Sequence, residues 1–249
     1  PNMEARYPGI NFSQFMGAEM MAKKYEFSRE ELDAFALESH RRAIAATESG
    51  AFKNEIVPLA IESADGGRTM HEVDEGIRFD ATMESIGAVK LLKEGGRITA
   101  ANASQICDGA SGVLVVSEAA LKAHNLTPMA RVHQLIVTGG DPVIMLEEPL
   151  PATAKALKKA GMSIDDIDLY EVNEAFAPVP MAWMKATGGD HEKLNVNGGA
   201  IALGHPLGAS GTKLMATLLH ALKARGKRYG LQTMCEGGGL ANVTIVESL

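Results

Sequence analysis

The sequence has no excess of basic residues, no long hydrophobic run and few aromatic residues. Its 249 residues include 31 acidic and 24 basic side chains, which gives a formal net charge of −7. Proteins that bind nucleic acid normally show the opposite balance. A membrane-spanning helix needs a run of about 18 apolar residues, and none is present. We therefore expect neither nucleic acid nor a membrane among the partners.

Cysteine is also scarce. Cys107 and Cys235 are the two cysteines, too few for a disulfide framework, and reduced thiols in a cytoplasmic protein are the simplest interpretation. The histidines show no metal-ligand spacing with cysteines or carboxylates, so we predict no metal. The chain opens at Pro1 without an initiator methionine, a signal peptide or a targeting pattern. From this we expect that processing or truncation has removed a preceding segment.

Hydrophobic residues make up 46% and charged residues 22% of the chain, as in ordinary globular proteins. From residue 129 onward, strand-like and helix-like segments alternate, which is typical of an α/β domain with helices layered on a sheet. The predicted strands are 131–138, 169–172, 229–235 and 241–247, and the predicted helices are 152–160, 174–187 and 210–225.

The first half of the chain has a different sequence pattern. Residues 11–50 are predicted to be helical, with a capping box formed by Ser28 and Glu31 and a stop at Gly50. Residues 51–103 contain many glycines and few periodic runs, as in segments that carry binding loops. The β-branched run at 112–117 predicts a strand covered on both faces, followed by a helix at 118–124.

Two motifs lie where a strand ends or a helix begins. Asn173-Glu174-Ala175-Phe176 directly follows a predicted strand, where side chains commonly face a ligand crevice, although a helix N-cap is the alternative. His205 lies within the glycine-rich run at 198–211, where the backbone can approach a ligand closely, although a structural histidine remains the alternative. The residue order of a Walker A loop and that of a nucleophile elbow are both absent.

A third motif is Cys235-Glu236-Gly237-Gly238-Gly239. A cysteine at a strand end before three glycines could act as a thiolate against backbone donors, although a lone cysteine is more commonly a packing residue. Cys107 has no comparable setting, and we interpret it as packing.

In this order the three motifs resemble the thiolase family. The resemblance rests on Asn-Glu-Ala-Phe, on Gly-Gly-Ala-Ile-Ala-Leu-Gly-His-Pro-Leu-Gly-Ala-Ser-Gly and on Cys-x-Gly-Gly-Gly, and upstream agreement extends it over essentially the whole chain. It implies the thiolase fold, a layered α/β/α arrangement with a mixed sheet and helices on both faces, and we expect five strands in that sheet. The implied divisions are a CoA-binding loop domain at 1–103, the last strand and helix of an amino-terminal domain at 104–125, and a carboxyl-terminal domain at 126–249.

The resemblance also implies roles for the catalytic residues. His205 would deprotonate a nucleophilic cysteine and then help to bind the thioester oxygen, and Asn173 would hold a water that completes this oxyanion site. Cys235 would be the general acid/base, for which an unperturbed thiol pKa near 8.5 is well suited. The backbone N–H of Gly237 would belong to a second oxyanion hole. The nucleophilic cysteine itself is expected in a preceding half of the protein.

Coenzyme A is implied as a substrate, with no resident cofactor. Arg78 matches the position that lies against the adenine, with a surface salt bridge as the alternative. The other implied contacts with nucleotide or pantetheine are Ser85, Ala100, Ser104, Met16, Ala175, Phe176 and Ser210.

The expected activity is cleavage of a 3-ketoacyl-CoA by CoA, in a cytoplasmic homodimer or homotetramer that requires the amino-terminal thiolase half. Phe15 stands where some biosynthetic thiolases carry a histidine, and the run 232–239 looks most like thiolases that shorten steroid side chains. Two alternatives stay open: a biosynthetic acetoacetyl-CoA thiolase, and a non-catalytic thiolase-like subunit that binds CoA or lipid.

Overall fold

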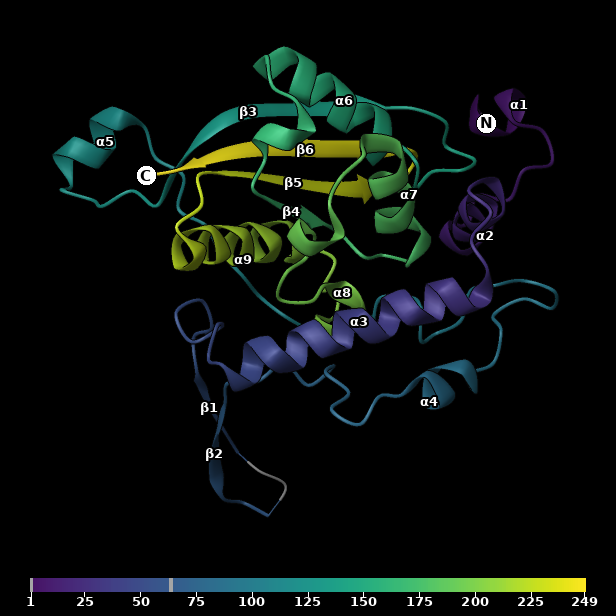
Figure 1. Cartoon of the computed structure of the whole chain (residues 1–249), viewed down its shortest axis with the longest axis horizontal. Coiled ribbons are helices and arrows are strands. Elements are labelled where there is room, and N and C mark those ends of the chain that lie inside the picture. Colours follow the sequence, from purple (N-terminus) through teal and green to yellow (C-terminus); the bar gives the residue numbers. More distant parts are fainter. Residues whose placement is uncertain (1, 63–64) are drawn as a thin grey trace.

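A mixed four-stranded sheet organises the carboxyl-terminal half of the protein. The computed structural model describes residues 2–62 and 65–249. The strand order is β3 (Ala130–Gly139), β6 (Leu240–Ser248), β5 (Tyr229–Glu236) and β4 (Leu169–Val172) (Figure 1). β6 pairs antiparallel with both β3 and β5, whereas β5 and β4 are parallel. The four predicted strands are therefore confirmed, and the carboxyl ends of β4 and β5 meet at one sheet edge.

The expectation of a fifth strand is wrong for the described part of the chain. Beside β4 the chain makes a single parallel bridge, between Tyr170 and Leu194. Asn195 then turns its side chain onto the strand: its Oδ1 accepts from the Val172 N–H and its Nδ2 donates to the Val172 carbonyl, both at 2.9 Å. Because an amide side chain occupies the backbone groups of β4, the ladder does not continue.

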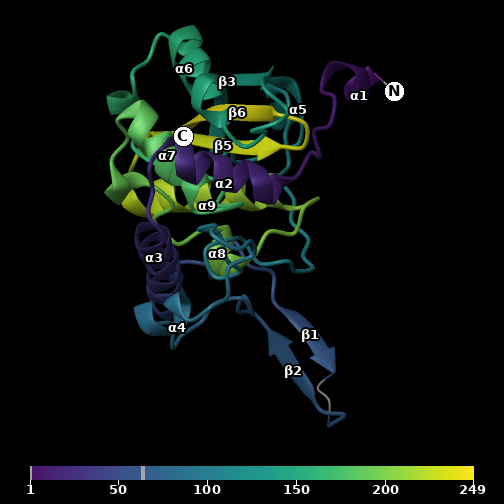
Figure 2. The ribbon, with the colours of Figure 1, turned by 90° about the vertical axis from the view of Figure 1, so that its right-hand side faces the viewer.

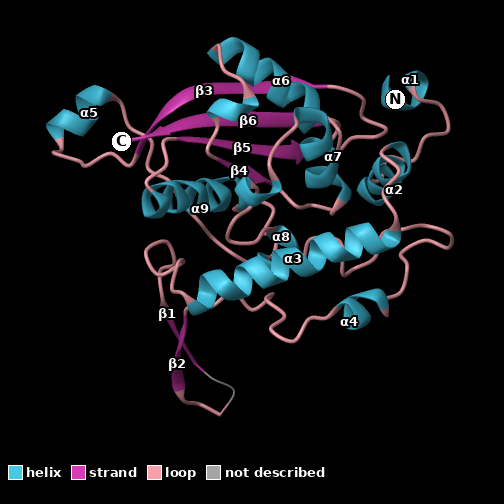
Figure 3. Ribbon diagram, viewed as in Figure 1, coloured by secondary structure: helices cyan, strands magenta, loops and turns pink. Residues whose placement is uncertain are grey.

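Helices cover both faces of the sheet, so the layered α/β arrangement is confirmed. α6 (Pro149–Ala160) and α7 (Pro178–Thr187) pack on one face and α9 (Ser210–Arg225) on the other (Figure 3). The main core lies on the α6–α7 side, where the rings of Tyr170 and Trp183 are buried with centroids 5.1 Å apart. On the opposite face, Leu218 and Leu222 of α9 pack against Leu169.

α7 begins later than the sequence predicted. The expected helix started at residue 174, but the observed one starts at Pro178, with Pro178 and Pro180 in its first turn. Proline has no N–H to donate to a preceding turn, so it is tolerated at a helix start and disrupts a helix interior. The Asn-Glu-Ala-Phe motif therefore lies in the connection from β4 to α7.

The long helix α3 (Arg29–Glu48) runs along the bottom of the layered domain in Figure 1. Its capping box is present as predicted, with the Ser28 hydroxyl accepting from the Glu31 N–H and the Glu31 carboxylate accepting from the Ser28 N–H. Gly50 follows the helix with a left-handed φ of 73°, which is the conformation that glycine adopts most easily after a helix end. The apolar and small residues predicted for one face are buried: Leu32, Phe35, Ala36, Ser39, Ala43 and Ala46.

The remaining amino-terminal elements are short, in keeping with the predicted irregular character of 51–103. They are α1 (Asn2–Arg6), α2 (Gln14–Lys24), the hairpin strands β1 (Leu59–Glu62) and β2 (Arg68–His71), and α4 (Met83–Gly87). Figure 2 shows the hairpin projecting away from the layered domain. Short elements in the second half are η1 (Ile164–Asp166), η2 (His191–Lys193) and α8 (Ala200–Leu203).

The strand predicted at 112–117 is not present. This run forms no strand, and Leu114 and Val115 are 77% and 78% exposed. A β-branched run becomes a strand only where another strand pairs with it, and no described segment does so. The helix that follows is confirmed as α5 (Glu118–Ala123). None of the helices in the described residues is long and apolar enough to cross a membrane.

Candidate active site

Asn173 and His205 meet at the sheet edge where β4 ends. The Asn173 N–H donates to the Thr233 carbonyl at 3.0 Å, which extends the β4–β5 pairing by one residue. The Asn173 side chain is 1% exposed, and its Nδ2 lies 3.4 Å from Nε2 of His205. Two residues that are 32 positions apart in the sequence thus present polar groups to each other.

The glycine-rich run that leads to His205 is needed for close packing. Gly198 has a φ of +83°, and a Cβ there would lie 2.7 Å from the carbonyl oxygen of Ser39 on α3. Gly204 has a φ of +81°, and a Cβ there would collide with the Cys107 side chain. Glycine is therefore required at both positions for conformation and for space. The His205 N–H then donates to the Gln105 carbonyl at 3.0 Å, which fixes the backbone at the histidine.

Ser210 sets the tautomer of His205. The Ser210 hydroxyl lies 2.5 Å from His205 Nδ1 and donates to the Pro206 carbonyl at 3.0 Å. Because the single hydroxyl proton is used on the carbonyl, the oxygen can only accept from the histidine. This bonding pattern favours the tautomer with the proton on His205 Nδ1, which leaves Nε2 as a basic nitrogen beside Asn173. Burial, followed by the nearby charge of Lys213, lowers the pKa of His205 below its usual 6.5, so the ring is neutral at pH 7.

Ser210 was proposed from the sequence as a CoA contact, and its bond to His205 was not foreseen. The side chain is 2% exposed, because the first turn of α9 packs directly under the histidine loop. The signal was present in the spacing: a histidine five residues before a serine at a helix start, with a proline between them, brings the hydroxyl back to the ring.

Cys235 lies one residue before the end of β5, near the same edge of the sheet. Its side chain packs against the main core on the α6–α7 side, and no hydrogen bond joins it to His205 or Asn173, all three of which are described residues. Burial raises the pKa of the Cys235 thiol to about 12, and the charge of Glu236 adds to this effect. The near-ordinary thiol pKa expected from the sequence is therefore wrong in this structure, and Cys235 is a protonated thiol at neutral pH.

Gly237 begins the turn between β5 and β6, one residue after the end of β5. A Cβ on Gly237 would meet nothing within 4 Å, so its backbone is accessible. Gly239 has a φ of +81° and packs against the carbonyl of Asp141. The Gly140 N–H donates to the Gly239 carbonyl at 2.8 Å. The turn is therefore fixed by a hydrogen bond at Gly239, whereas Gly237 at its start remains accessible.

Glu174 forms the buried support beneath the site. Its carboxylate accepts from the Ser39 hydroxyl at 2.6 Å, from Asn195 Nδ2 at 2.8 Å and from the Ile201 N–H at 3.1 Å. The residue is 1% exposed, and burial raises its pKa while these three donors oppose the rise. One carboxylate therefore ties α3, α8 and the segment after β4 together around Asn173, a role that was not predicted from the sequence.

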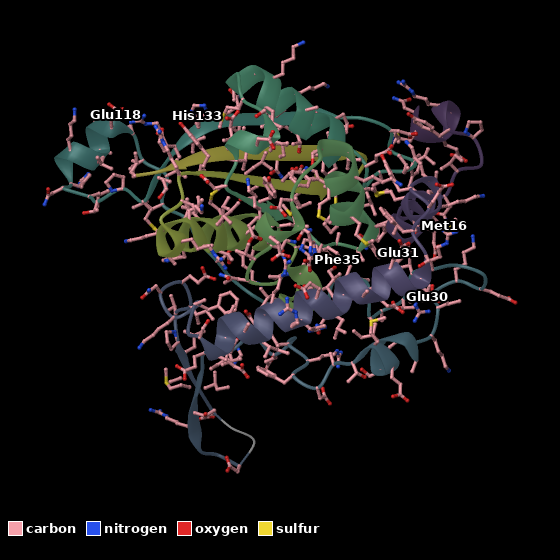
Figure 4. All side chains as sticks on the ribbon, viewed as in Figure 1. Met16, Glu30, Glu31, Phe35, Glu118 and His133 are labelled. Atoms are coloured by element: carbon pink, nitrogen blue, oxygen red, sulfur yellow. The ribbon has the colours of Figure 1, made fainter. Side chains whose placement is uncertain are left out.

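Several residues proposed to line the pantetheine path are adjacent. The Ser104 N–H donates to the Ala175 carbonyl at 3.0 Å, and Phe176 forms a backbone bridge with Ala103. The Phe176 ring is packed edge-on against Phe15 of α2, with centroids 5.6 Å apart. Met16, the next residue of α2, is 39% exposed and carries the label on α2 in Figure 4.

Other CoA candidates lie on the irregular segment, away from this group. Arg78 is exposed, and its backbone N–H donates to His40 Nδ1 at 3.2 Å. Residues 75–80 and Gln105 line an open hollow of about 470 Å³. The salt bridge considered as the alternative for Arg78 is not observed among the described residues. Ser85 caps α4 by accepting from the Thr82 N–H at 3.0 Å, and Ala100 is exposed.

The structure thus brings Asn173, His205 and Ser210 together at one sheet edge, and comparison with known families identifies the chain. The model of the thiolase amino-terminal domain matches residues 11–119, and that of the thiolase carboxyl-terminal domain matches residues 126–248. The chain therefore belongs to the thiolase family.

Individual relatives extend this result. The chain is 54% identical to the steroid 3-ketoacyl-CoA thiolase FadA6 of Mycobacterium tuberculosis over 98% of its own length and 58% of the relative's. It is 47% identical to the human mitochondrial 3-ketoacyl-CoA thiolase over 96% of its length and 60% of the relative's. The chain thus spans a little under two thirds of these relatives.

Solved structures agree in fold. The crystal structure of human mitochondrial 3-ketoacyl-CoA thiolase matches with a TM-score of 0.88 and 44% identity, covering 94% of this chain and 59% of that one. The acetyl-CoA acetyltransferase of Bacillus anthracis matches with a TM-score of 0.91 and 39% identity, covering 97% of this chain and 61% of that one.

Proposed function

We propose that the protein containing this chain is a degradative 3-ketoacyl-CoA thiolase, which cleaves a 3-ketoacyl-CoA with CoA to give acetyl- or propionyl-CoA and a shortened acyl-CoA. The observation that carries the proposal is the meeting of His205 with Asn173 on one side of its ring and with Ser210 on the other. Ser210 and the Pro206 carbonyl leave Nε2 as a free base, next to an amide that can donate to an oxyanion. This pair of groups suits nucleophilic attack on a carbonyl.

The first half-reaction needs a thiol nucleophile. No hydrogen bond joins His205 to Cys107 or Cys235 in the described structure, so the proposed nucleophile is a third thiol, outside these 249 residues. His205 Nε2 takes its proton, and the thiolate attacks the 3-keto carbon. The bond between C2 and C3 then breaks, and an acyl group remains on the nucleophile as a thioester. The acetyl- or propionyl-CoA part of the substrate departs as an enolate.

The raised pKa of the Cys235 thiol suits the proton transfers to the enolate and from the incoming CoA. A half-buried thiol that is protonated at neutral pH can give its proton to C2 of the enolate and release acetyl- or propionyl-CoA. The thiolate left behind is unstable in an apolar setting and is therefore a strong base. It removes the proton from the thiol of the incoming CoA, whose sulfur attacks the acyl thioester. Shortened acyl-CoA leaves, His205 gives its proton back to the nucleophilic thiolate, and both protein thiols return to their starting states.

CoA would be bound as a substrate by the irregular segment, with Arg78 against the nucleotide and with Ser104, Ala175, Phe176 and Met16 along the pantetheine arm. Two observations support this assignment. Arg78 is exposed beside a hollow without an ion-pair partner in the described residues, and the Ser104 backbone is bonded to that of Ala175. Ser85 and Ala100 are exposed on the same segment.

The substrate class we propose is a bulky 3-ketoacyl-CoA, because the relative named for steroid substrates is 54% identical. The apolar pair of Phe15 and Phe176 supports an apolar acyl group near α2. The second candidate is a biosynthetic acetoacetyl-CoA thiolase, favoured by 47% identity with the acetyl-CoA acetyltransferase of Escherichia coli. A homodimer or homotetramer in the cytoplasm is part of the proposal.

The deciding experiment compares kcat/KM for a 3-ketoacyl-CoA with a ring-bearing acyl group and for acetoacetyl-CoA, with the protein extended to the length of its relatives. A preference for the bulky substrate supports the degradative assignment. A strong preference for acetoacetyl-CoA favours the biosynthetic one. Binding of CoA without turnover of either substrate would point to the non-catalytic alternative.

The 249-residue chain alone is the matched control, and we expect it not to turn over. Robust turnover by the short chain would mean that Cys107 or Cys235 is the nucleophile, contrary to the roles proposed above.

A further inference from the structure

A small cavity lies behind the site, between β4, the first turns of α9 and the glycine-rich run. Its volume is about 10 Å³ for a water-sized sphere, close to the lower limit of roughly 10–15 Å³ that one water needs. The polar side chains in its lining are Glu171, Asn173, Ser210, Lys213 and Thr217.

Two unpaired acceptors, on Glu171 and Asn173, line this cavity, and two more belong to residues that neighbour its lining. Five buried side-chain atoms in the described residues have no hydrogen-bond partner within the protein, and four of them are Glu171 Oε2, Asn173 Oδ1, Gln232 Oε1 and Glu55 Oε2. Glu171 and Asn173 are two positions apart along β4 and so point to the same face of the sheet. Gln232 is the partner of Glu171 on β5, and Glu55 accepts from Thr217 of α9 at 3.0 Å.

Burying acceptors without donors is unfavourable in free energy unless another interaction compensates. A buried acceptor without a donor costs about 1–3 kcal/mol, and Glu171 and Asn173 are each 1% exposed. The charged donor in the cavity lining is Lys213, which also donates to the Leu203 carbonyl at 3.0 Å. Because the Lys213 ammonium already donates to that carbonyl, the two acceptors in the lining, Glu171 Oε2 and Asn173 Oδ1, call for a further donor.

We propose that Glu171 is a positioning residue, which acts through one buried water to hold the Asn173 amide with Oδ1 toward the cavity and Nδ2 toward His205. The Glu171 O–H donates to the water, and the water donates to Asn173 Oδ1. An amide whose oxygen is held on one side must present its N–H₂ group on the other. In the structure the side of the amide away from the cavity faces His205, whose Nε2 lies 3.4 Å from Asn173 Nδ2. The inference deepens the proposed function and rests on it for its kinetic part.

The protonation state agrees with this geometry. Burial first, then the charges of Glu174 and Glu55, raise the pKa of Glu171 well above its usual value, while Lys213 opposes the rise. These are the ionisable groups that face Glu171 from the β4 segment, from the loop after α3 and from α9. A carboxyl group with a raised pKa keeps its proton, and so its ability to donate, to a higher pH than an ordinary glutamate, and loses it as the pH rises through its folded-state pKa.

Two substitutions separate positioning from packing. Glu171→Gln keeps the shape and can donate through its amide, whereas Glu171→Leu keeps the volume and cannot donate. In the active, full-length protein we expect Glu171→Leu to lower kcat about 10- to 100-fold, as for loss of an orienting partner behind a functional group, with KM for CoA unchanged. Glu171→Gln is expected to stay within about threefold of the parent, as in rescue by a conservative change.

The pH profile adds a second kinetic readout. A Glu171 side chain that must be protonated contributes to the alkaline decline of kcat, and the Gln variant, which cannot ionise, should extend activity to higher pH.

Lys213→Met tests whether the Lys213 ammonium, rather than Glu171, is the donor that holds the Asn173 amide. If Lys213→Met abolishes kcat while Glu171→Leu leaves it unchanged, Lys213 holds the amide and the proposal is wrong. Equal losses in Glu171→Gln and Glu171→Leu, with equal falls in melting temperature, would show a purely structural role and overturn it as well.

A crystal structure of the same protein gives a test that is independent of activity. The expected result is one ordered water within 3.2 Å of both Glu171 Oε2 and Asn173 Oδ1, roughly the upper limit for a hydrogen bond, and its loss in Glu171→Leu. A cavity without that water in the parent would overturn the proposal even if the enzyme is active. An ordered water in a protein that cleaves no 3-ketoacyl-CoA would instead support the positioning and reject the proposed function.

Discussion

Two regions of the molecule hold their polar side chains in opposite ways. At the sheet edge, Asn173, Glu174 and Ser210 are almost completely buried and bonded to neighbouring elements. On the irregular segment, Arg78 and Ser85 are exposed; Ser85 bonds within its own helix cap, and the Arg78 backbone, not its side chain, bonds to His40. Bond-making chemistry needs groups fixed within tenths of an ångström, whereas a nucleotide can be bound by exposed donors that adjust to it. The difference predicts that substitutions in the first region lower kcat and those in the second raise KM.

The largest effect is expected at the base. His205→Ala removes the Nε2 lone pair that Ser210 leaves free, so we expect kcat to fall by roughly 10³–10⁴, at the upper end of the range for a general base. The measurement is steady-state thiolysis by the full-length protein. His124→Ala is the matched control, because His124 is exposed at the end of α5 and should leave kcat unchanged. A loss below tenfold at His205 would remove the histidine from the proposed role.

Next in size is the support beneath the site. Glu174→Leu leaves three buried donors without an acceptor, from Ser39, Asn195 and Ile201, and we expect a loss of about 3 kcal/mol or more in the free energy of unfolding. Glu118, labelled on α5 in Figure 4, is exposed. Glu118→Gln should change stability by less than about 0.5 kcal/mol. Denaturant unfolding of both variants measures the difference, and equal stabilities would mean that the Glu174 network contributes nothing net.

The same comparison shows what the sequence could predict. The caps at Ser28 and Gly50 and the strand and helix segments after residue 129 follow from local patterns, and the structure has them. The missing strand at 112–117 fails because strand formation depends on a distant partner that no local pattern reveals. The bond of Ser210 to His205 closes within the glycine-rich run, and that of Ser39 to Glu174 joins segments far apart in the sequence. Their residue types were visible in the sequence, but their pairing depends on how α3 and α9 pack.

A smaller effect on kcat is expected when the base is kept and its orienting partner is removed. Ser210→Ala deprives the Nδ1–H of its acceptor, and we expect kcat to fall about 10- to 100-fold with KM for CoA little changed. Ser210→Thr, which restores a hydroxyl, is the rescue variant. If Ser210→Ala instead raises KM for CoA and leaves kcat intact, Ser210 is the CoA contact that the family resemblance first implied.

The exposed region should respond in KM. Arg78→Ala is expected to raise KM for CoA about tenfold, equivalent to about 1.4 kcal/mol, with kcat retained, because a charge-assisted contact to a phosphate or a stacked adenine is lost. Arg225→Ala, at the exposed end of α9, is the control. Raising the salt concentration should weaken CoA binding by the parent more than by the Arg78→Ala variant. A fall in kcat without a change in KM would break the division between the two regions.

The smallest expected effect is a displacement of the pH profile. The active form of His205 is the neutral ring, which is present above its folded-state pKa and lost as the pH falls through it. Burial, and then the charge of Lys213, hold that pKa below 6.5, so kcat/KM should persist below pH 6.5 before it declines. Lys213→Met removes the repelling charge while the burial remains, and the acidic midpoint should move upward toward the ordinary histidine value. The exposed Lys227→Met, at the start of the turn after α9, is the control for net charge. An unchanged midpoint in Lys213→Met would mean that burial alone sets the pKa of His205, and a downward displacement would contradict the sign of the interaction.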